Sequence, residues 1–212
     1  FTSCSDESIV HPDSSPKERE TQICMNDYKY VDLILGKQCQ TKMGRGGIHP
    51  LEFKTFSKEM QNAITNYCQA GGNFFVSGAY VASDLWDNRL VKANEEDKKF
   101  AMEVLKYKWR VGQAARNGKV KSVASPFPEI TGSYTYYQDL NPESYVVESP
   151  DALEPAAQGA FTILRYSENN LSAGIAYKGN YKTCVLGFPF EAIRTVTERE
   201  LLMKAILTFF EH

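Results

Sequence analysis

The first half of the chain alternates between apolar runs and one strongly amphipathic segment. Residues 28–36 (YKYVDLILG) and the run that begins at Asn73 (NFFVSGAYVASDL) are continuous apolar stretches, typical of strands that are covered on both faces. Between them, residues 57–72 carry apolar positions at helical spacing, with Ser57 as a cap and two glycines as a stop. Because a helix leads directly into a buried strand, this order predicts a right-handed, mostly parallel α/β sheet.

From Trp109 onward the pattern changes to short β-like runs that are separated by Gly, Asn and Pro. Helices are expected over residues 97–106 and 198–210, and residues 181–190 (YKTCVLGFPF) are typical of a last buried strand. The pattern therefore predicts one α/β domain over residues 1–212. Its mostly parallel sheet would have helices on both faces and an antiparallel β extension in the second half.

Composition excludes several classes of function. The 212 residues carry 24 Lys and Arg against 26 Asp and Glu, which gives a net charge of −2. This near balance argues against a nucleic-acid partner, because affinity for phosphate backbones needs concentrated basic residues. No apolar run approaches the ~20 residues that a membrane-spanning helix needs. The mean hydropathy of −0.40 is ordinary for a globular domain.

Two features concern the context of the chain. It begins with Phe1 rather than Met, which we interpret as a sign of a processed product or a fragment. Its five cysteines are scattered and form no CxxC pair, so neither a structural zinc site nor another metal centre is predicted. One or two disulfides are compatible with an exported protein, and small buried thiols are the alternative that we favour. No cofactor is predicted.

The second apolar run contains a strand-to-turn junction with the sequence Ser77-Gly78-Ala79. Small residues in this position are typical of a nucleophile elbow, in which a sharp turn lifts one side chain above a sheet. An elbow enzyme needs Cys or Ser at the apex, but Gly78 and Ala79 have no nucleophilic atom. Ser77 is adjacent, and we interpret it as a small residue that tight packing tolerates.

A later segment resembles a motif of class I glutamine amidotransferases. Residues 186–191 (LGFPFE) are similar to the late-strand motif GVQFHPE of that family, whose flavodoxin-like domains carry a Cys at an elbow of the type GxCxG. In this register Glu191 matches, Pro189 stands where the family has its His, and Ala79 (or Gly78) stands where it has its Cys. The resemblance implies a three-layer, flavodoxin-like fold with a degenerate site. Without an imidazole to orient, Glu191 is expected to have a structural or ligand-orienting role.

A broader resemblance covers most of the chain. It rests on the runs SCSDES, YKYVDLILGKQ, SGAYVASDLWDN, SYVVESPDALEPA, AFTILRYSENN, SAGIAYKG and GFPFEAI. These runs are similar to the amidotransferase-like domain of bacterial proteins named as xanthan lyases, which are multidomain, secreted or cell-surface proteins with carbohydrate-binding-like modules. The resemblance implies an extracellular, periplasmic or cell-surface location. It also implies carbohydrate and other domains of the same polypeptide as partners, and a further strand and helix upstream of SCSDES.

The carboxyl edge of the predicted sheet is the expected place for a ligand. If SCSDES and SGAYVASD end neighbouring parallel strands, their loops meet at this edge. The side chains that would then share one cleft are Asp6, Glu7, Ser77, Tyr80 and Asp84. Metal binding by Asp6, Glu7, Asp84 and Asp87 is an alternative, but carboxylates that cap helices explain these residues better.

Two functions are compatible with these patterns, and we expect the first. It is a non-catalytic, amidotransferase-like module with a binding or scaffolding role in a carbohydrate-related protein. Tyrosines of the second half would either stack against sugar rings or pack within a sheet: Tyr134, Tyr136, Tyr137 and Tyr145. The alternative is a polysaccharide lyase acting by β-elimination. Side chains with suitable chemistry, which no spacing unites, are Tyr137, Arg165, Asn169 and Asn170.

Overall fold

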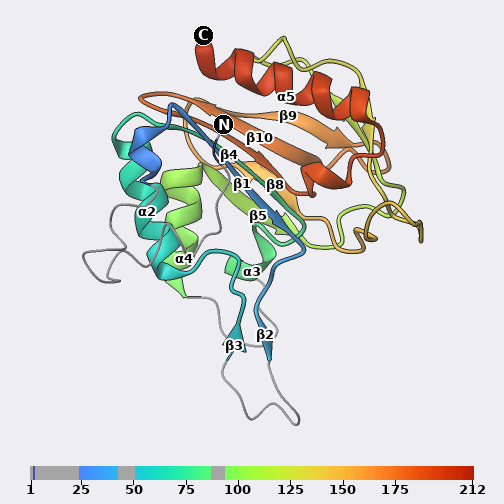
Figure 1. Ribbon diagram of the computed structural model, residues 1–212, viewed down its shortest axis with the longest axis horizontal. Helices are drawn as coiled ribbons and strands as arrows, with labels where there is room; N and C mark the ends of the chain where they lie inside the picture. Colours follow the sequence, from blue (N-terminus) through green and yellow to red (C-terminus); the bar gives the residue numbers. More distant parts are fainter. Residues whose placement is uncertain (1, 3–23, 43–50, 87–93) are drawn as a thin grey trace.

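The computed structural model describes residues 2, 24–42, 51–86 and 94–212, and its main element is a seven-stranded sheet (Figure 1). The spatial order of the strands is β1-β4-β11-β10-β9-β6-β7. Their bounds are β1 (Tyr30–Gly36), β4 (Asn73–Gly78), β6 (Lys119–Ser122), β7 (Ser133–Thr135), β9 (Ala160–Tyr166), β10 (Ser172–Lys178) and β11 (Lys182–Leu186). Two further strand pairs are β2 (Thr41–Lys42) with β3 (Leu51–Glu52) and β5 (Tyr107–Val111) with β8 (Ala152–Pro155).

The helical elements are short apart from two. They are α2 (Lys58–Gln69), α3 (Ser83–Trp86), α4 (Glu95–Phe100) and α5 (Val196–Glu211), with the 3₁₀ turns η2 (Met25–Asp27) and η5 (Phe190–Ala192) and the π-helical turn η4 (Ala101–Leu105). The helix expected over residues 97–106 is therefore α4 followed by η4. It ends at Lys106, whose φ of 67° is left-handed.

The prediction of a three-layer, flavodoxin-like and mostly parallel sheet is wrong. Strand β4 pairs in parallel with β1 on one side and with β11 on the other, whereas the four remaining pairings of the seven-stranded sheet are antiparallel. The reason lies in the connections: parallel neighbours need a long crossover, usually a helix, but the fully described stretch 107–186 contains no helix. The antiparallel strands that the sequence indicates as an extension therefore make up most of the sheet.

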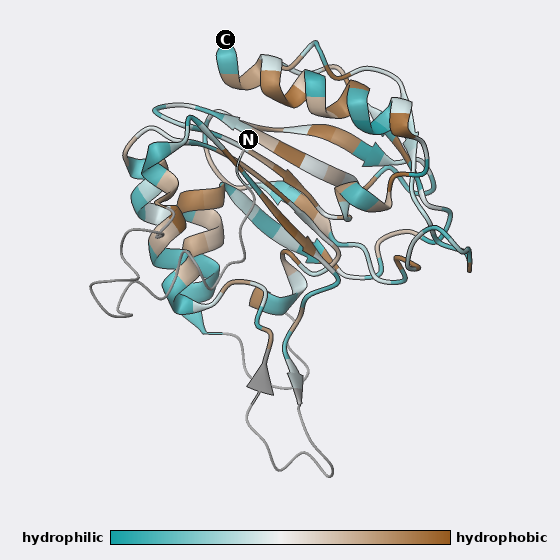
Figure 2. Ribbon diagram, in the orientation of Figure 1, coloured by the Kyte–Doolittle hydropathy of each residue, from teal (hydrophilic) through white to brown (hydrophobic). Residues whose placement is uncertain are grey.

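The two faces of the sheet are covered by different helices, and the core divides accordingly (Figure 1). In β4, Phe74 and Val76 belong to the apolar cluster formed with α2, α4 and η4, whereas Phe75 belongs to the cluster formed with α5. Strand β11 alternates in the same way, with Val185 toward the first cluster and Leu186 toward the second. Figure 2 shows brown, apolar residues concentrated in these central strands. Such two-sided burial explains their nearly continuous apolar sequences.

Helix α2 begins with the cap that its sequence predicts, whereas the cap of α5 was not predicted. At the start of α2, the Ser57 hydroxyl accepts a hydrogen bond from the N–H of Met60, and the chain after the helix turns at Gly71 with a φ of 90°. Helix α5 begins at Val196, two residues before the predicted start. Thr195 caps it in a reciprocal capping box with Glu198, and this pairing fixes the helix start.

Candidate functional site

The turn after β4 has the strand–turn–helix order of a nucleophile elbow but carries no nucleophile at its apex. Strand β4 ends at Gly78, and α3 begins at Ser83 after a turn that includes the buried Ala79. A Cβ atom added to Gly78 would lie 2.9 Å from the Cβ of Leu35, so close packing requires glycine there. Ser77 is fully buried within β4, and its hydroxyl has no hydrogen-bond partner among the described residues.

A buried carboxylate accepts hydrogen bonds from the backbone N–H groups at the start of α3. Asp151 Oδ2 accepts hydrogen bonds from the N–H groups of Ala82 and Ser83, both at 2.8 Å, and from the Ser83 hydroxyl at 3.2 Å. Burial raises the pKa of Asp151 to about 7, although these donors oppose the shift. The N–H of Ala79 donates to the carbonyl of Gly36 at 2.8 Å. These three amides are therefore satisfied within the chain and do not form a free oxyanion hole.

The late motif places Glu191 beside the end of β1. Pro189 is buried, and Glu191 lies in η5, which contacts β1. The Tyr145 hydroxyl donates to Glu191 Oε1 at 2.6 Å, and a Cβ on Gly36 would approach that same oxygen to 3.3 Å. Glu191 Oε2 is buried and has no hydrogen-bond partner among the described residues. Burial and the hydrogen bond to Glu191 raise the pKa of Tyr145, so this hydroxyl stays protonated and acts as a donor.

Asp32, an exposed carboxylate within β1, is not among the residues that the sequence predicts for a site. Desolvation and the negative charge of Glu191 raise the pKa of Asp32 to about 7. Asp32 is in register with Phe75, which belongs to the cluster under α5. Tyr30, two residues earlier on the same side of β1, stacks on Phe210 of α5 at 5.8 Å. Asp32 therefore lies on the α5 side of the sheet. The one available signal was a charged residue inside an otherwise apolar run.

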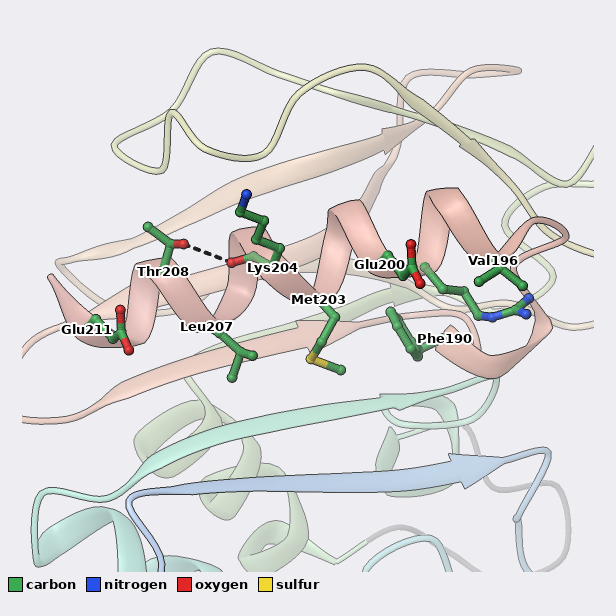
Figure 3. Close-up of a pocket in the computed structure, with 9 residues that line it drawn as sticks. Phe190, Val196, Glu200, Met203, Lys204, Leu207, Thr208 and Glu211 are labelled. Carbon is green, nitrogen blue, oxygen red and sulfur yellow. Dashed lines mark hydrogen bonds between the residues drawn. The ribbon is translucent and has the colours of Figure 1, made fainter. Parts of the chain in front are cut away.

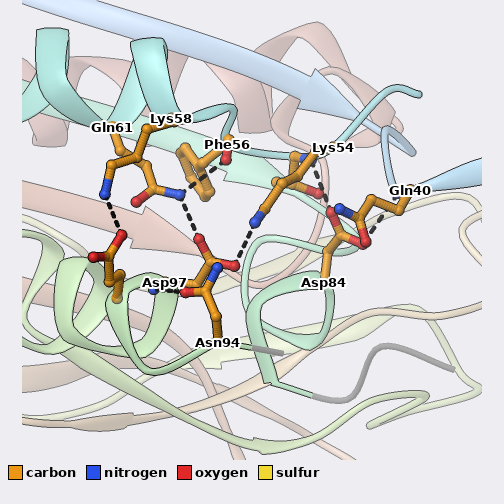
Figure 4. A network of polar contacts seen from close by, with 10 residues as sticks. Gln40, Lys54, Phe56, Lys58, Gln61, Asp84, Asn94 and Asp97 are labelled. Atoms are coloured by element: carbon orange, nitrogen blue, oxygen red, sulfur yellow. Dashed lines mark hydrogen bonds and ion pairs between the residues drawn. The ribbon is translucent and has the colours of Figure 1, made fainter. Parts of the chain in front are cut away.

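Asp84, which the sequence predicts for the ligand cleft, is engaged in a network of structural contacts (Figure 4). Its carboxylate accepts the backbone N–H of Gln40 at 3.0 Å and that of Thr55 at 2.8 Å. The Thr55 hydroxyl in turn contacts the carbonyl of Tyr80 at 3.3 Å, which links this network to the turn after β4. Asp84 thus holds two loops together.

The remaining members of the predicted cleft and of the alternative metal site, Asp6, Glu7 and Asp87, lie outside the described residues. Within the part of the chain that the structure describes, no group of three or more His, Cys, Asp or Glu side chains is placed to hold a metal ion. Cys68 and Cys184 are buried and free, and burial raises the pKa of both thiols.

Most of the tyrosines considered as sugar-stacking platforms lie inside the protein. Tyr134, Tyr136 and Tyr137 are buried, and the ring of Tyr136 stacks on Phe188 at 5.0 Å. Tyr145 is half-buried and bound to Glu191. The first three rings therefore pack in the core and offer no open face to a ligand.

The residues with suitable lyase chemistry each serve local structure. The hydroxyl of Tyr137 donates to Glu143. The guanidinium of Arg165 donates to the carbonyl of Asn170 at 2.7 Å, and the Asn169 amide donates to the carbonyl of Ala114 at 2.6 Å. Asn170 itself is a turn residue with a φ of 64°. These contacts explain the four residues without a reaction.

An open groove of about 510 Å³ runs along α5 on the side that faces β4 and β1 (Figure 3). Four apolar side chains line it: Phe190, Val196, Met203 and Leu207. Figure 3 shows Met203 and Leu207 pointing from α5 toward these strands, with Phe190 beside them. Phe190 precedes Glu191 in η5, but Glu191 itself does not line the groove.

Comparison with known proteins provides a fold likeness and no family. No protein-family model matches the chain, and no curated protein matches it. Among solved structures, a cold-adapted β-galactosidase from Rahnella sp. R3 is similar with a TM-score of 0.52 and 12% identity, over 89% of this chain and 24% of the enzyme. This chain therefore spans about a quarter of that protein and shares the fold of that part.

Two further solved structures are similar at lower TM-scores. The exo-β-1,4-mannosidase Op5Man5 from Opitutaceae bacterium strain TAV5 gives 0.46 at 8% identity, over 89% of this chain and 25% of that enzyme. The N-terminal domain of mmIFT52 gives 0.39 at 14% identity, over 74% of this chain and 72% of that domain.

None of the helices in the described residues has the length and apolar character to cross a membrane.

Proposed function

We propose that this chain is a non-catalytic module with a binding or scaffolding role in a larger, carbohydrate-related protein of the cell surface or the secreted fraction. Two observations support the carbohydrate context. One is the sequence resemblance to the amidotransferase-like domain of proteins named as xanthan lyases. The other is the likeness to about a quarter of a β-galactosidase.

The observation that carries the proposal is the closed turn after β4. Acyl-transfer enzymes need a nucleophile with an adjacent base, together with free N–H donors aimed at the developing oxyanion. Here the apex residues are Gly78 and Ala79, and the carboxylate of Asp151 already accepts two of the nearby N–H groups. Expelling a buried, multiply hydrogen-bonded carboxylate to free those donors would cost several kcal/mol, on the order of 3–5.

The late motif supports the same interpretation. Pro189 has no group that accepts or delivers a proton, and Glu191 accepts its hydrogen bond from Tyr145 rather than from an imidazole. Tyr145 and Glu191 hold η5 against the segment before β8, which is a positioning role.

Activity assays on the purified chain test the proposal. Release of ammonia from glutamine and small amides, and formation of unsaturated product from xanthan and other uronate polymers, should stay at the level of a heat-denatured control. Turnover in proportion to the concentration of folded protein would overturn the proposal. If turnover occurs, Ser77→Ala and Cys184→Ala variants identify whether a buried nucleophile of this chain causes it.

A further inference from the structure

The chain contains one tripeptide of the type Asn-x-Ser/Thr, at Asn170-Leu171-Ser172. This tripeptide is the acceptor for N-linked glycosylation, in which an oligosaccharide is joined to the side-chain amide of the asparagine. Because such tripeptides also arise by chance, the structure around this one decides whether it is a site. A glycan requires a surface turn and an asparagine side chain that no other contact uses.

The acceptor asparagine lies in the turn between β9 and β10. Residues 167–171 form this connection, and residues 167–170 are exposed. The backbone of Asn170 is fixed, because its N–H donates to the Tyr166 carbonyl at 2.9 Å and its carbonyl accepts from Arg165 at 2.7 Å. Its side-chain amide makes no hydrogen bond within the part of the chain that the structure describes. An oligosaccharide on this amide nitrogen would therefore extend into solvent without breaking a contact.

The neighbouring asparagine is, in contrast, occupied. The Asn169 amide donates to the carbonyl of Ala114 at 2.6 Å, and its Oδ1 accepts the N–H of Leu171 at 3.0 Å. Of the two adjacent asparagines, the one that begins the tripeptide is thus also the one whose amide is available.

Backbone conformation explains part of this sequence but not all of it. Asn170 has a φ of 64°, a region in which asparagine is enriched, so the turn alone accounts for the asparagine. It does not account for Ser172, the first residue of β10, which is 7% exposed. The Ser172 hydroxyl contacts the carbonyl of Gly174 at 3.4 Å, which is long for a hydrogen bond. Its position two residues after the acceptor, where N-glycosylation requires a hydroxyl, explains this serine better than its packing does.

An acidic residue precedes the acceptor by two positions. Glu168 gives the segment the form Glu-x-Asn-x-Ser, and bacterial oligosaccharyltransferases recognise an acidic side chain at this position in addition to the tripeptide. In the folded turn, Glu168 Oε2 accepts the N–H of Arg116 at 2.7 Å. Recognition of this carboxylate, like that of the buried Ser172 hydroxyl, therefore requires a chain in which the turn has not yet formed.

We propose that Asn170 is an N-glycosylation site, which is modified during export before the turn between β9 and β10 folds. This inference rests on the proposed role at the cell surface or in the secreted fraction. The donor is an oligosaccharide that is linked to a lipid through a diphosphate. A bond forms between Asn170 Nδ2 and the anomeric carbon of the sugar, and the bond from that carbon to the diphosphate oxygen breaks. Nδ2 loses one proton to a base of the transferase, and the lipid diphosphate leaves with the electron pair of the broken bond.

Export of the chain into the periplasm of a bacterial host tests the site. The host supplies the signal peptide, a bacterial oligosaccharyltransferase and its lipid-linked oligosaccharide, and a matched host carries an inactive transferase. Trypsin releases residues 166–178 as one peptide, and tandem mass spectrometry locates any added oligosaccharide within it. We expect the oligosaccharide on Asn170 in the host with the active transferase and an unmodified peptide in the matched host.

Four variants separate the acceptor from its surroundings. Asn170→Asp, which keeps a residue that tolerates a positive φ, and Ser172→Ala should both abolish the modification. Ser172→Thr and Asn169→Gln keep the tripeptide and should retain it. Circular dichroism of the purified variants shows whether each one folds.

A comparison of folded and unfolded acceptors tests the order of the two events. The purified, unmodified chain, incubated with the transferase and its donor, should react roughly tenfold or more slowly than a synthetic peptide of residues 166–178, because the folded turn must first open. Equal rates would overturn the proposed order.

Three results would overturn the site itself. They are an unmodified peptide in the host with the active transferase, an oligosaccharide on a residue other than Asn170, and modification that persists in Ser172→Ala. Each would leave the non-catalytic proposal intact, because the host supplies the export signal and no activity of the chain is measured. Turnover in the activity assays, by contrast, would refute the proposed function.

Discussion

Replacement of Asp151 is the most direct test of how the turn after β4 is held. The Asp151→Ala variant removes the one oxygen that accepts the N–H groups of Ala82 and Ser83, each at 2.8 Å. Ala82 is fully buried and Ser83 is 9% exposed, so water does not readily replace the lost acceptor. Each buried N–H left without a partner costs about 1–3 kcal/mol, and removal of a desolvated carboxylate returns part of that cost. We expect Asp151→Ala to lose roughly 3 kcal/mol of unfolding free energy.

Two further variants separate the hydrogen bonds from other effects of the substitution. Asp151→Asn keeps a carbonyl oxygen in the same position and should lose only about 1 kcal/mol. Asp139→Ala removes an exposed carboxylate that pairs with Arg194 on the surface, and exposed pairs contribute about 0–1 kcal/mol. Urea unfolding followed by far-UV circular dichroism gives the three values at constant m-value. The reasoning is refuted if Asp151→Ala is no less stable than Asp139→Ala, because the turn would then not depend on this carboxylate.

Three other predictions follow from the same structure. Burial raises the pKa of Asp151 from 3.8 to about 7, so the native state binds more protons and stability should fall as the pH rises from about 4 through 7. Asp151→Asn should flatten that part of a urea-midpoint profile, and an unchanged slope would contradict the burial argument. Gly187→Ala should destabilise the protein by about 3 kcal/mol or more, because its Cβ would lie 2.0 Å from the Asp151 carbonyl oxygen, and a thermal melt as high as wild type would refute this contact. Thr195→Ala should cost about 1 kcal/mol through loss of the α5 cap, whereas Thr195→Ser should cost less in the same urea titration.

The sequence predicted those features that are set by residues only a few positions apart in the chain. Ser57 before α2 and the glycines after it mark the ends of that helix, because a cap is a bond between residues three positions apart. The absence of a nucleophile at Gly78-Ala79 could also be read directly, since the identity of a side chain decides whether it can attack. Most of the short β-like runs after Trp109 are strands in the structure, but their pattern did not show that they would form most of the sheet.

The contacts within the candidate site, in contrast, join residues far apart in the chain and could not be predicted from the sequence. Asp32 and Glu191 are more than 150 positions apart, and only the packing of η5 against β1 brings their charges together. Likewise, Asp151 reaches the start of α3 across 68 positions, and no periodicity of either segment indicates that contact.

The sequence by itself indicated the two long helices and most of the strands, which positions are apolar, and that the elbow lacks a reactive atom, but it did not indicate the short helix α3. Tertiary structure alone decided the direction in which each strand pairs, the closure of the turn by Asp151, and the groove beside α5. The physical reason is that the alternation of apolar and polar side chains along a strand decides which of its faces is buried. The direction in which two strands pair, and which charged groups come close together, depend instead on how distant segments are connected and packed.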